Sequence, residues 1–113
     1  MRLNNILLEK EKFPLITVSE KKLTILIAKD GKRYCAFCPE LDLVTELDTM
    51  SETVQDIIEA IRDYAREYLE NISLYSKSPN RAHHLPYIKD IASCKDDWEL
   101  MNFIEVRYGR LQL

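Results

Sequence analysis

The sequence predicts a small α+β protein, in which a three-stranded antiparallel β-meander packs on one long amphipathic helix. Three observations predict this fold: an Asp-Gly turn between two β-rich runs, a third short apolar run, and a capped segment with helical periodicity. All three lie within residues 21–72, which we expect to form the core. A chain of 113 residues supports one domain with a core of modest size.

The first two strands are predicted at residues 23–28 and 33–38. The first of these runs is rich in β-branched residues, which favour strands. Asp30 and Gly31 follow, and we expect them to occupy the centre of a type I′ turn, where both residues need a positive φ. Residues 43–47 are predicted to return as the third antiparallel strand.

A long helix is predicted to begin at Thr49. Thr49 and Glu52 have the spacing of a capping box, in which the threonine hydroxyl accepts a hydrogen bond from the later amide. Apolar side chains then recur three and four residues apart, at Val54, Ile57, Ile58, Ile61, Tyr64, Ala65, Tyr68 and Leu69. We expect this stripe to cover one face of the sheet and to bury the main core.

Residues 1–20 are predicted to be an N-terminal extension, with strand composition at residues 15–18. The sequence shows neither a signal peptide nor an apolar run long enough to cross a membrane. Three cysteines, an odd number without secretory context, favour reduced thiols and a cytoplasmic protein.

Residues 73–113 are predicted to form a short, mainly helical C-terminal extension that begins with a linker. A first helix is predicted to begin near Pro86, because proline is favoured in the first turn. A second helix is predicted at residues 97–108, since Asp96 begins a second capping box. A strand at residues 103–108 is the competing prediction, because that segment also alternates between apolar and polar residues.

Cys35 and Cys38 form a C-x-x-C motif inside the second predicted strand. A redox pair or a zinc knuckle requires the two sulfur atoms to converge. Residues three apart on a strand point to opposite faces of the sheet. We therefore predict structural cysteines with no shared chemistry.

His83 and His84 are adjacent, and we expect their side chains to diverge. Three interpretations remain open: solvated or interface histidines, a metal site with Cys94, or a general acid or base. The first is favoured, because no nucleophile or other catalytic partner is placed beside the pair.

Four carboxylates surround the third predicted strand, at Glu40, Asp42, Glu46 and Asp48. Even spacing puts the last three on one face, where carboxylates can hold magnesium for hydrolysis. Solvated surface is the commoner role. With two glycines the chain has no phosphate-binding glycine loop, so we predict a protein with no enzymatic activity, cofactor or metal.

The same carboxylates are the candidate partner-binding residues, together with three aromatic residues outside the predicted core. Those aromatic residues are Tyr75, Tyr87 and Trp98. Tyrosine and tryptophan are favoured as anchors in protein interfaces. A net charge of −3 suits a basic partner, because complementary charge speeds association.

Residues 34–69 resemble the HicB-like antitoxin family, and with the preceding strand the likeness covers somewhat under half of the chain. The matching pieces are Tyr34, Cys38-Pro39-Glu40-Leu41, Val44-Thr45, Asp48-Thr49 and the helix from Glu52 to Tyr68-Leu69. Where the family often carries a glycine after Cys-Pro-Glu-Leu, this chain has Asp42-Leu43, so we expect a different loop.

The resemblance implies a partial RNase H-like fold without catalytic carboxylates, and a homo-oligomer such as a dimer or tetramer. It also implies a partner, a HicA-like ribonuclease toxin, and DNA binding by a separate C-terminal module. A stand-alone member without a toxin is the alternative.

The function that we expect is therefore that of a non-enzymatic, oligomeric, antitoxin-like module that binds and inhibits a small ribonuclease. The edge strand of the sheet and the carboxylates would form the contact surface. A nucleic-acid-binding regulator that uses residues 79–113 is the first alternative. A metal-dependent hydrolase that uses the carboxylates is the second.

Overall fold

The computed structural model describes residues 20–112, so the strand predicted at residues 15–18 lies outside the described residues. Within this range no helix is long and apolar enough to cross a membrane.

A four-stranded sheet forms one layer of the molecule, in the order β3-β2-β1-β4. Its strands are β1 (Leu23–Asp30), β2 (Arg33–Cys38), β3 (Leu43–Leu47) and β4 (Ile104–Tyr108). Neighbours among β1, β2 and β3 are antiparallel, whereas β4 is parallel to β1. The α+β class is confirmed, but the sheet is mixed and has one strand more than predicted.

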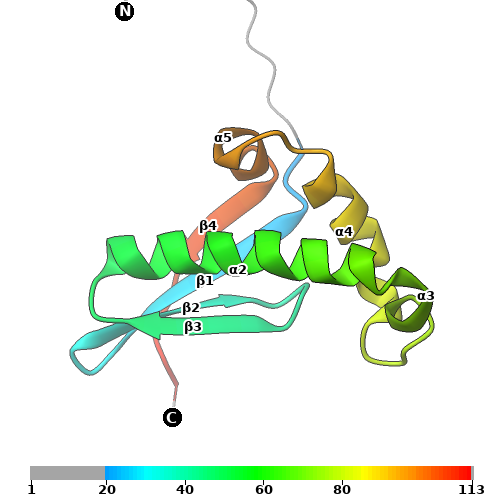
Figure 1. Ribbon diagram of the computed structural model, residues 1–113. Helices are drawn as coiled ribbons and strands as arrows, with labels where there is room; N and C mark the ends of the chain where they lie inside the picture. The colour runs from blue at the N-terminus through cyan, green and yellow to red at the C-terminus, as the bar shows by residue number, and fades with distance from the viewer. Residues whose placement is uncertain (1–19, 113) are drawn as a thin grey trace, which may run out of the picture.

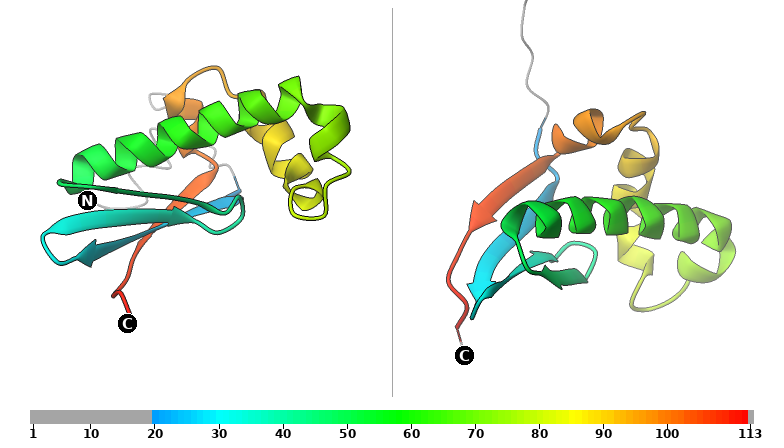
Figure 2. Two further views of the ribbon diagram at one scale, coloured as in Figure 1. Left: turned by 60° about the horizontal axis from the view of Figure 1, so that its bottom comes forward. Right: turned by 60° about the vertical axis from the view of Figure 1, so that its left-hand side comes forward.

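Helices form the second layer, and α2 (Met50–Glu70) crosses one face of the sheet (Figure 1). The remaining helical elements are α3 (Ile72–Tyr75), the 3-10 turn η2 (Ala82–His84), α4 (Leu85–Ala92) and α5 (Asp97–Met101). The two further views show that all of these helices lie on the α2 side or at the end of the sheet (Figure 2). The opposite face, here called the outer face, is covered by no described helix.

The core lies between the sheet and α2, and the predicted apolar stripe supplies the α2 side of it. Buried residues of α2 are Thr53, Ile57, Ile58, Ile61, Ala65 and Tyr68. Leu69 was also expected in the stripe, but it is 40% exposed and lines an open pocket between α2 and α4. The start of the helix is as predicted: the Thr49 hydroxyl accepts from the Glu52 amide at 3.1 Å.

The β1–β2 hairpin is confirmed, but its turn is not the predicted type I′. Asp30 pairs with Arg33, so the central residues are Gly31 and Lys32. Gly31 has a φ of 62°, whereas Lys32 is not among the residues with positive φ. This pattern is that of a type II′ turn, in which only the first central residue needs a positive φ.

The second helix predicted in the C-terminal segment is wrong for most of its length. A short helix, α5, does begin at the Asp96 cap, whose carboxylate accepts from the Glu99 amide at 2.9 Å. Residues 104–108 then form β4, the competing prediction. Residues 104–108 form a strand because they pair with β1. This pairing satisfies the backbone groups along an edge of β1 that would otherwise be free, and it buries Ile104.

Residues 73–113 also contribute to the same core as residues 21–72. Ile88 and Ile91 of α4 are buried against it, as is Leu100 of α5. The segment expected to be an extension therefore completes both the sheet and the core.

Candidate functional site

The outer face carries a row of apolar side chains across three strands. Leu26 of β1 pairs with Phe37 of β2, and Phe37 pairs with Val44 of β3. These side chains are 39%, 38% and 69% exposed, respectively. Arg107 of β4 continues the row next to Leu26. Contiguous exposed apolar side chains of this kind often mark interaction sites.

A hollow of about 480 Å³ lies next to this row, between the outer face and the C-terminal segment. Leu26, Cys35 and Phe37 line one side of the hollow, and residues 107–112 line the other. The segment stays beside β1 because the Gly109 amide donates to the Ile27 carbonyl at 2.9 Å. We call the row and this hollow together the outer surface.

Glu40, one of the predicted contact residues, is hydrogen-bonded within the protein. Its carboxylate accepts from both the amide and the hydroxyl of Thr24, each at 2.9 Å. These bonds form where Pro39, which has no amide hydrogen, ends the β1–β2 ladder. Glu40 therefore replaces a missing strand partner and is not free for another protein.

The other three predicted carboxylates do not share a site. Asp42 lies before β3 and Asp48 lies after it, so the strand separates the two by about 20 Å. Asp48 and Glu46 are both paired with Arg33, at 3.1 and 3.4 Å. The hydrolase interpretation required these carboxylates to converge on one metal, and the structure does not bring them together.

Asp42 instead meets the two histidines. One ligand atom from each of Asp42, His83 and His84 lies within 4.8 Å of the others. The ring centroids of His83 and His84 are 4.3 Å apart, so the expected divergence of their side chains is wrong. The irregular backbone of the η2 turn, which sequence periodicity did not reveal, brings the rings to one side.

His84 is buried at the centre of this cluster. Its Nδ1 lies 2.6 Å from the Tyr64 hydroxyl of α2, and its Nε2 lies 3.4 Å from Asp42 Oδ2. Burial is the main cause that lowers the pKa of His84, and nearby His83 lowers it further. Burial likewise raises the pKa of Tyr64. The ring is therefore neutral at pH 7, with one nitrogen able to act as a ligand.

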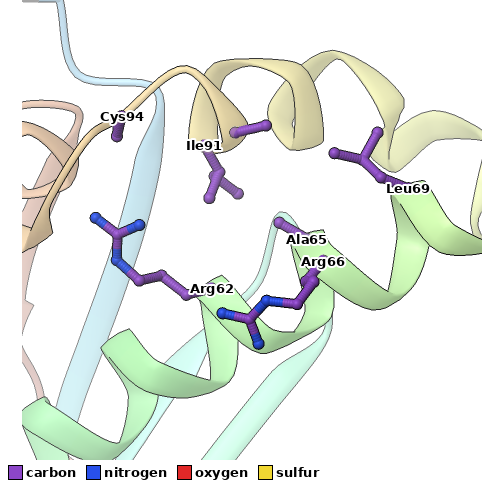
Figure 3. Close-up of a pocket in the computed structure, with 7 residues that line it drawn as sticks. Arg62, Ala65, Arg66, Leu69, Ile91 and Cys94 are labelled. Atoms are coloured by element: carbon purple, nitrogen blue, oxygen red, sulfur yellow. The ribbon is translucent and has the colours of Figure 1, made fainter.

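Cys94 takes no part in that cluster, contrary to one interpretation of the sequence. Its thiol donates to the Asp90 carbonyl at 3.4 Å and lines a separate pocket between α2 and α4. Figure 3 shows Arg62 and Arg66 of α2 at this pocket, across from Ile91 and Cys94. The pocket has a volume of about 210 Å³.

The three predicted aromatic anchors are spread over different parts of the molecule. Tyr75 donates to Glu67 at 2.7 Å, and Arg81 lies 4.2 Å from its ring centroid. Tyr87 is half-buried against the core. Trp98 is 77% exposed on α5. Of the three, Trp98 alone presents a largely free apolar surface.

The cysteines of the C-x-x-C motif lie as predicted on opposite faces of β2. Cys38 is buried on the α2 side, Cys35 is half-buried on the outer side, and all three cysteines of the chain are free. Burial, reinforced by Glu40, raises the pKa of Cys38 to about 12. The thiol therefore stays protonated at neutral pH and does not act as a nucleophile.

The fold and the outer surface define a small α+β protein with a face suited to binding. The chain belongs to the PHD-like family, described as "Antitoxin of toxin-antitoxin, RelE / RelB, TA system", whose model matches residues 7–106. No curated protein matches the chain. Among the carboxylates and aromatic residues predicted from the sequence, Glu46 lies beside this outer surface, but as a group they do not mark it. The alternation of apolar residues around Leu26, Phe37 and Val44 was the signal that could have found it.

A solved structure from Syntrophomonas wolfei subsp. wolfei has the same fold, with a TM-score of 0.69 and 24% sequence identity. It is described as "an antitoxin part of a putative toxin/antitoxin system". The match covers 78% of this chain and 64% of that chain, so this chain spans less than two thirds of that antitoxin's length. At this identity the likeness establishes the fold alone.

Proposed function

We propose that this protein is a non-enzymatic antitoxin that binds and inhibits a small ribonuclease toxin through its outer surface. Membership of an antitoxin family implies a toxin partner of some kind. The observation that carries the choice of surface is the exposed row of Leu26, Phe37 and Val44. A partner that removes these contiguous apolar side chains from water would gain binding free energy.

The acidic net charge of the chain supports a basic partner, although Arg107 and Arg110 line the hollow end of the outer surface. The chain has a net charge of −3, and Glu46 lies on the outer face beside the apolar row, paired with Cys35 across β2 and β3. Because β3 is an edge strand, a partner can also reach its free backbone groups. A small basic toxin meets both features, through an apolar centre and a charged rim.

The finer family assignment is also a proposal. HicB-like sequence pieces coincide with β2, β3, the Thr49 cap and α2, which supports a HicB-like, partial RNase H-like antitoxin. A HicA-like ribonuclease is the corresponding toxin. We further propose a cytoplasmic homo-oligomer, either a dimer or a tetramer, whose mass light scattering of the purified protein would establish.

Copurification tests the toxin surface directly. The full chain is coexpressed with a tagged HicA-like ribonuclease toxin, and Phe37→Asp is compared with Trp98→Ala. We expect Phe37→Asp to weaken toxin binding at least tenfold and to restore ribonuclease activity, because it buries a charge in the apolar centre. Trp98→Ala removes a more exposed aromatic side chain, on α5 and outside the row, and should retain binding.

The opposite pattern, with binding lost in Trp98→Ala alone, would move the contact to α5. Retention by both variants would contradict the proposed surface. If Phe37→Asp changes only the oligomer mass, a second copy of this chain occupies the row.

DNA binding through residues 79–113 remains a prediction that no observation favours. This segment supplies α4 and β4 to the core, so truncating it would also unfold the sheet.

A further inference from the structure

Two segments distant in the sequence bring three metal-ligand side chains together at one end of the sheet. Asp42 lies in the loop between β2 and β3, whereas His83 and His84 lie in η2, just before α4. In Figure 1 this loop lies near the start of α4, beneath the end of α2. The cluster thus joins a strand connection to a helical segment.

The buried nitrogen of His84 is the observation that points to a ligand. His84 is 3% exposed, and its Nε2 has no hydrogen-bond partner among the described residues. A buried polar nitrogen left without a partner destabilises the folded state, so it usually has a bonded partner. This atom lies 3.4 Å from Asp42 Oδ2, which is longer than a good N–H···O hydrogen bond.

The spacing of these two atoms is that of neighbouring zinc ligands. In a tetrahedral site with bonds of about 2.0–2.1 Å, adjacent ligand atoms are about 3.3 Å apart. The distance from His84 Nε2 to Asp42 Oδ2 is 3.4 Å. An ion at this position would satisfy the nitrogen and the carboxylate together.

Tyr64 orients the buried ring from its other side. Its hydroxyl lies 2.6 Å from His84 Nδ1. When Nδ1–H donates to the phenol oxygen, the lone pair stays on Nε2, where a metal requires it. This arrangement is typical of metal-binding histidines, whose second nitrogen bonds to a fixed protein oxygen.

The backbone at Asp42 supports a role for its carboxylate. Its φ is 57°, a left-handed conformation that glycine adopts without strain. Aspartate tolerates this conformation at some cost in stability. The chain therefore keeps a carboxylate at a position where glycine would fit the backbone better.

We propose that Asp42, His83 and His84 bind one Zn²⁺ ion and that this ion fastens the β2–β3 loop to the start of α4. Two imidazoles and a carboxylate form a nitrogen and oxygen donor set that suits zinc. Asp42 and His83 are exposed, so a fourth coordination position faces solvent and accepts water.

The test uses the full-length protein, stripped of metal with a chelator and titrated with Zn²⁺ against a chromophoric competitor. We expect one ion per chain and a Tm that rises with the zinc concentration, because binding to the folded state alone stabilises it. His83→Ala and Asp42→Asn should each weaken binding at least tenfold. Tyr64→Phe should weaken it about 10–100-fold, as expected when the group that orients a ligand is lost.

Asp42→Gly separates loss of a ligand from loss of the fold. Glycine relieves the left-handed conformation, so the metal-free variant should melt no lower than the metal-free wild type, yet show no zinc-dependent rise in Tm. Asp48→Asn and Cys94→Ser are matched controls outside the cluster, and both should bind zinc normally.

Zinc binding that survives both His83→Ala and Asp42→Asn would overturn the proposal, and so would the absence of binding at micromolar free zinc. Loss of binding in Cys94→Ser would assign the ion to a different site.

Discussion

The inner face of the sheet is covered by α2, whereas the outer face presents similar apolar side chains to solvent. On β1, Ile25 and Ile27 are fully buried, while Leu26 between them is 39% exposed. The same strands therefore serve two purposes. Burial on the inner face stabilises the fold, and the outer face keeps apolar area for a partner. Substitutions on the two faces should have opposite consequences for stability and for binding.

The largest loss of stability is expected from a substitution in the core beneath the inner face. Ile61→Ala removes a fully buried side chain of α2 and leaves a cavity, so the free energy of unfolding should fall by about 2–5 kcal/mol. Urea unfolding followed by circular dichroism measures this change. Val44→Thr, which keeps a β-branched residue on the outer face, is the matched control and should change stability by less than about 0.5 kcal/mol. Equal losses in the two variants would contradict the difference between the faces.

The buried Cys38 on the inner face should make the stability of the protein depend on pH. The folded state raises the pKa of Cys38 from 9.0 to about 12, so its contribution to stability is intact below pH 9 and is lost as the pH rises toward 12. Between pH 8 and pH 10 this loss amounts to about 1 kcal/mol. The decline should be smaller in Cys38→Ala, measured by urea unfolding at both pH values.

Alkylation of the native protein at pH 8.5 provides a second measurement for these cysteines. Cys35, which is half-buried on the outer face, should react well before Cys38. Mass spectrometry of the labelled peptides would show the order, and similar rates for both thiols would contradict the assignment of faces.

Removing the N-terminal cap of α2, the helix that covers the inner face, should lower stability by less than the core substitution does. Thr49→Ala removes the side chain that accepts from the Glu52 amide at the start of α2. Stability should fall by about 1 kcal/mol, whereas Thr49→Ser keeps the cap and most of the stability. Thermal unfolding of the two variants measures the difference, and equal losses would show that the hydroxyl is not responsible.

The smallest effect on stability is expected from the charges at the far end of β3. Arg33→Gln breaks the exposed ion pairs with Glu46 and Asp48, which should cost less than about 1 kcal/mol and less still in high salt. Unfolding at two salt concentrations measures this dependence. A large, salt-independent loss would show that this end of β3 is part of the stabilising core.

Some of these features could be predicted from the sequence because their causes are local. Residues 33–38 and 43–47 form strands with the predicted bounds, and α2 begins at the predicted Thr49 cap. A turn glycine, a proline and a regular spacing of apolar residues specify such elements within a few residues. The opposite orientation of Cys35 and Cys38 also follows from the alternation along a strand.

Other features depend on contacts between distant segments. The alternation at residues 104–108 fitted both a helix and a strand, and the free edge of β1 decided for the strand. The carboxylates around β3 looked alike in the sequence, yet Glu40 binds Thr24, Asp48 binds Arg33 and Asp42 meets His84. Spacing along the chain does not show which residues a loop and a 3-10 turn bring together.

By itself, the sequence determined an α+β protein with a hairpin, a third antiparallel strand and a capped helix that buries one face of the sheet. Only the tertiary structure decided that the sheet has a fourth, parallel strand and that Asp42 meets two histidines. It also decided that no helix within residues 20–112 covers the apolar row on the outer face. The physical reason is the range of the forces involved. Backbone preferences and side-chain periodicity act over a few residues, whereas strand pairing and a cluster of ligands require distant segments to meet.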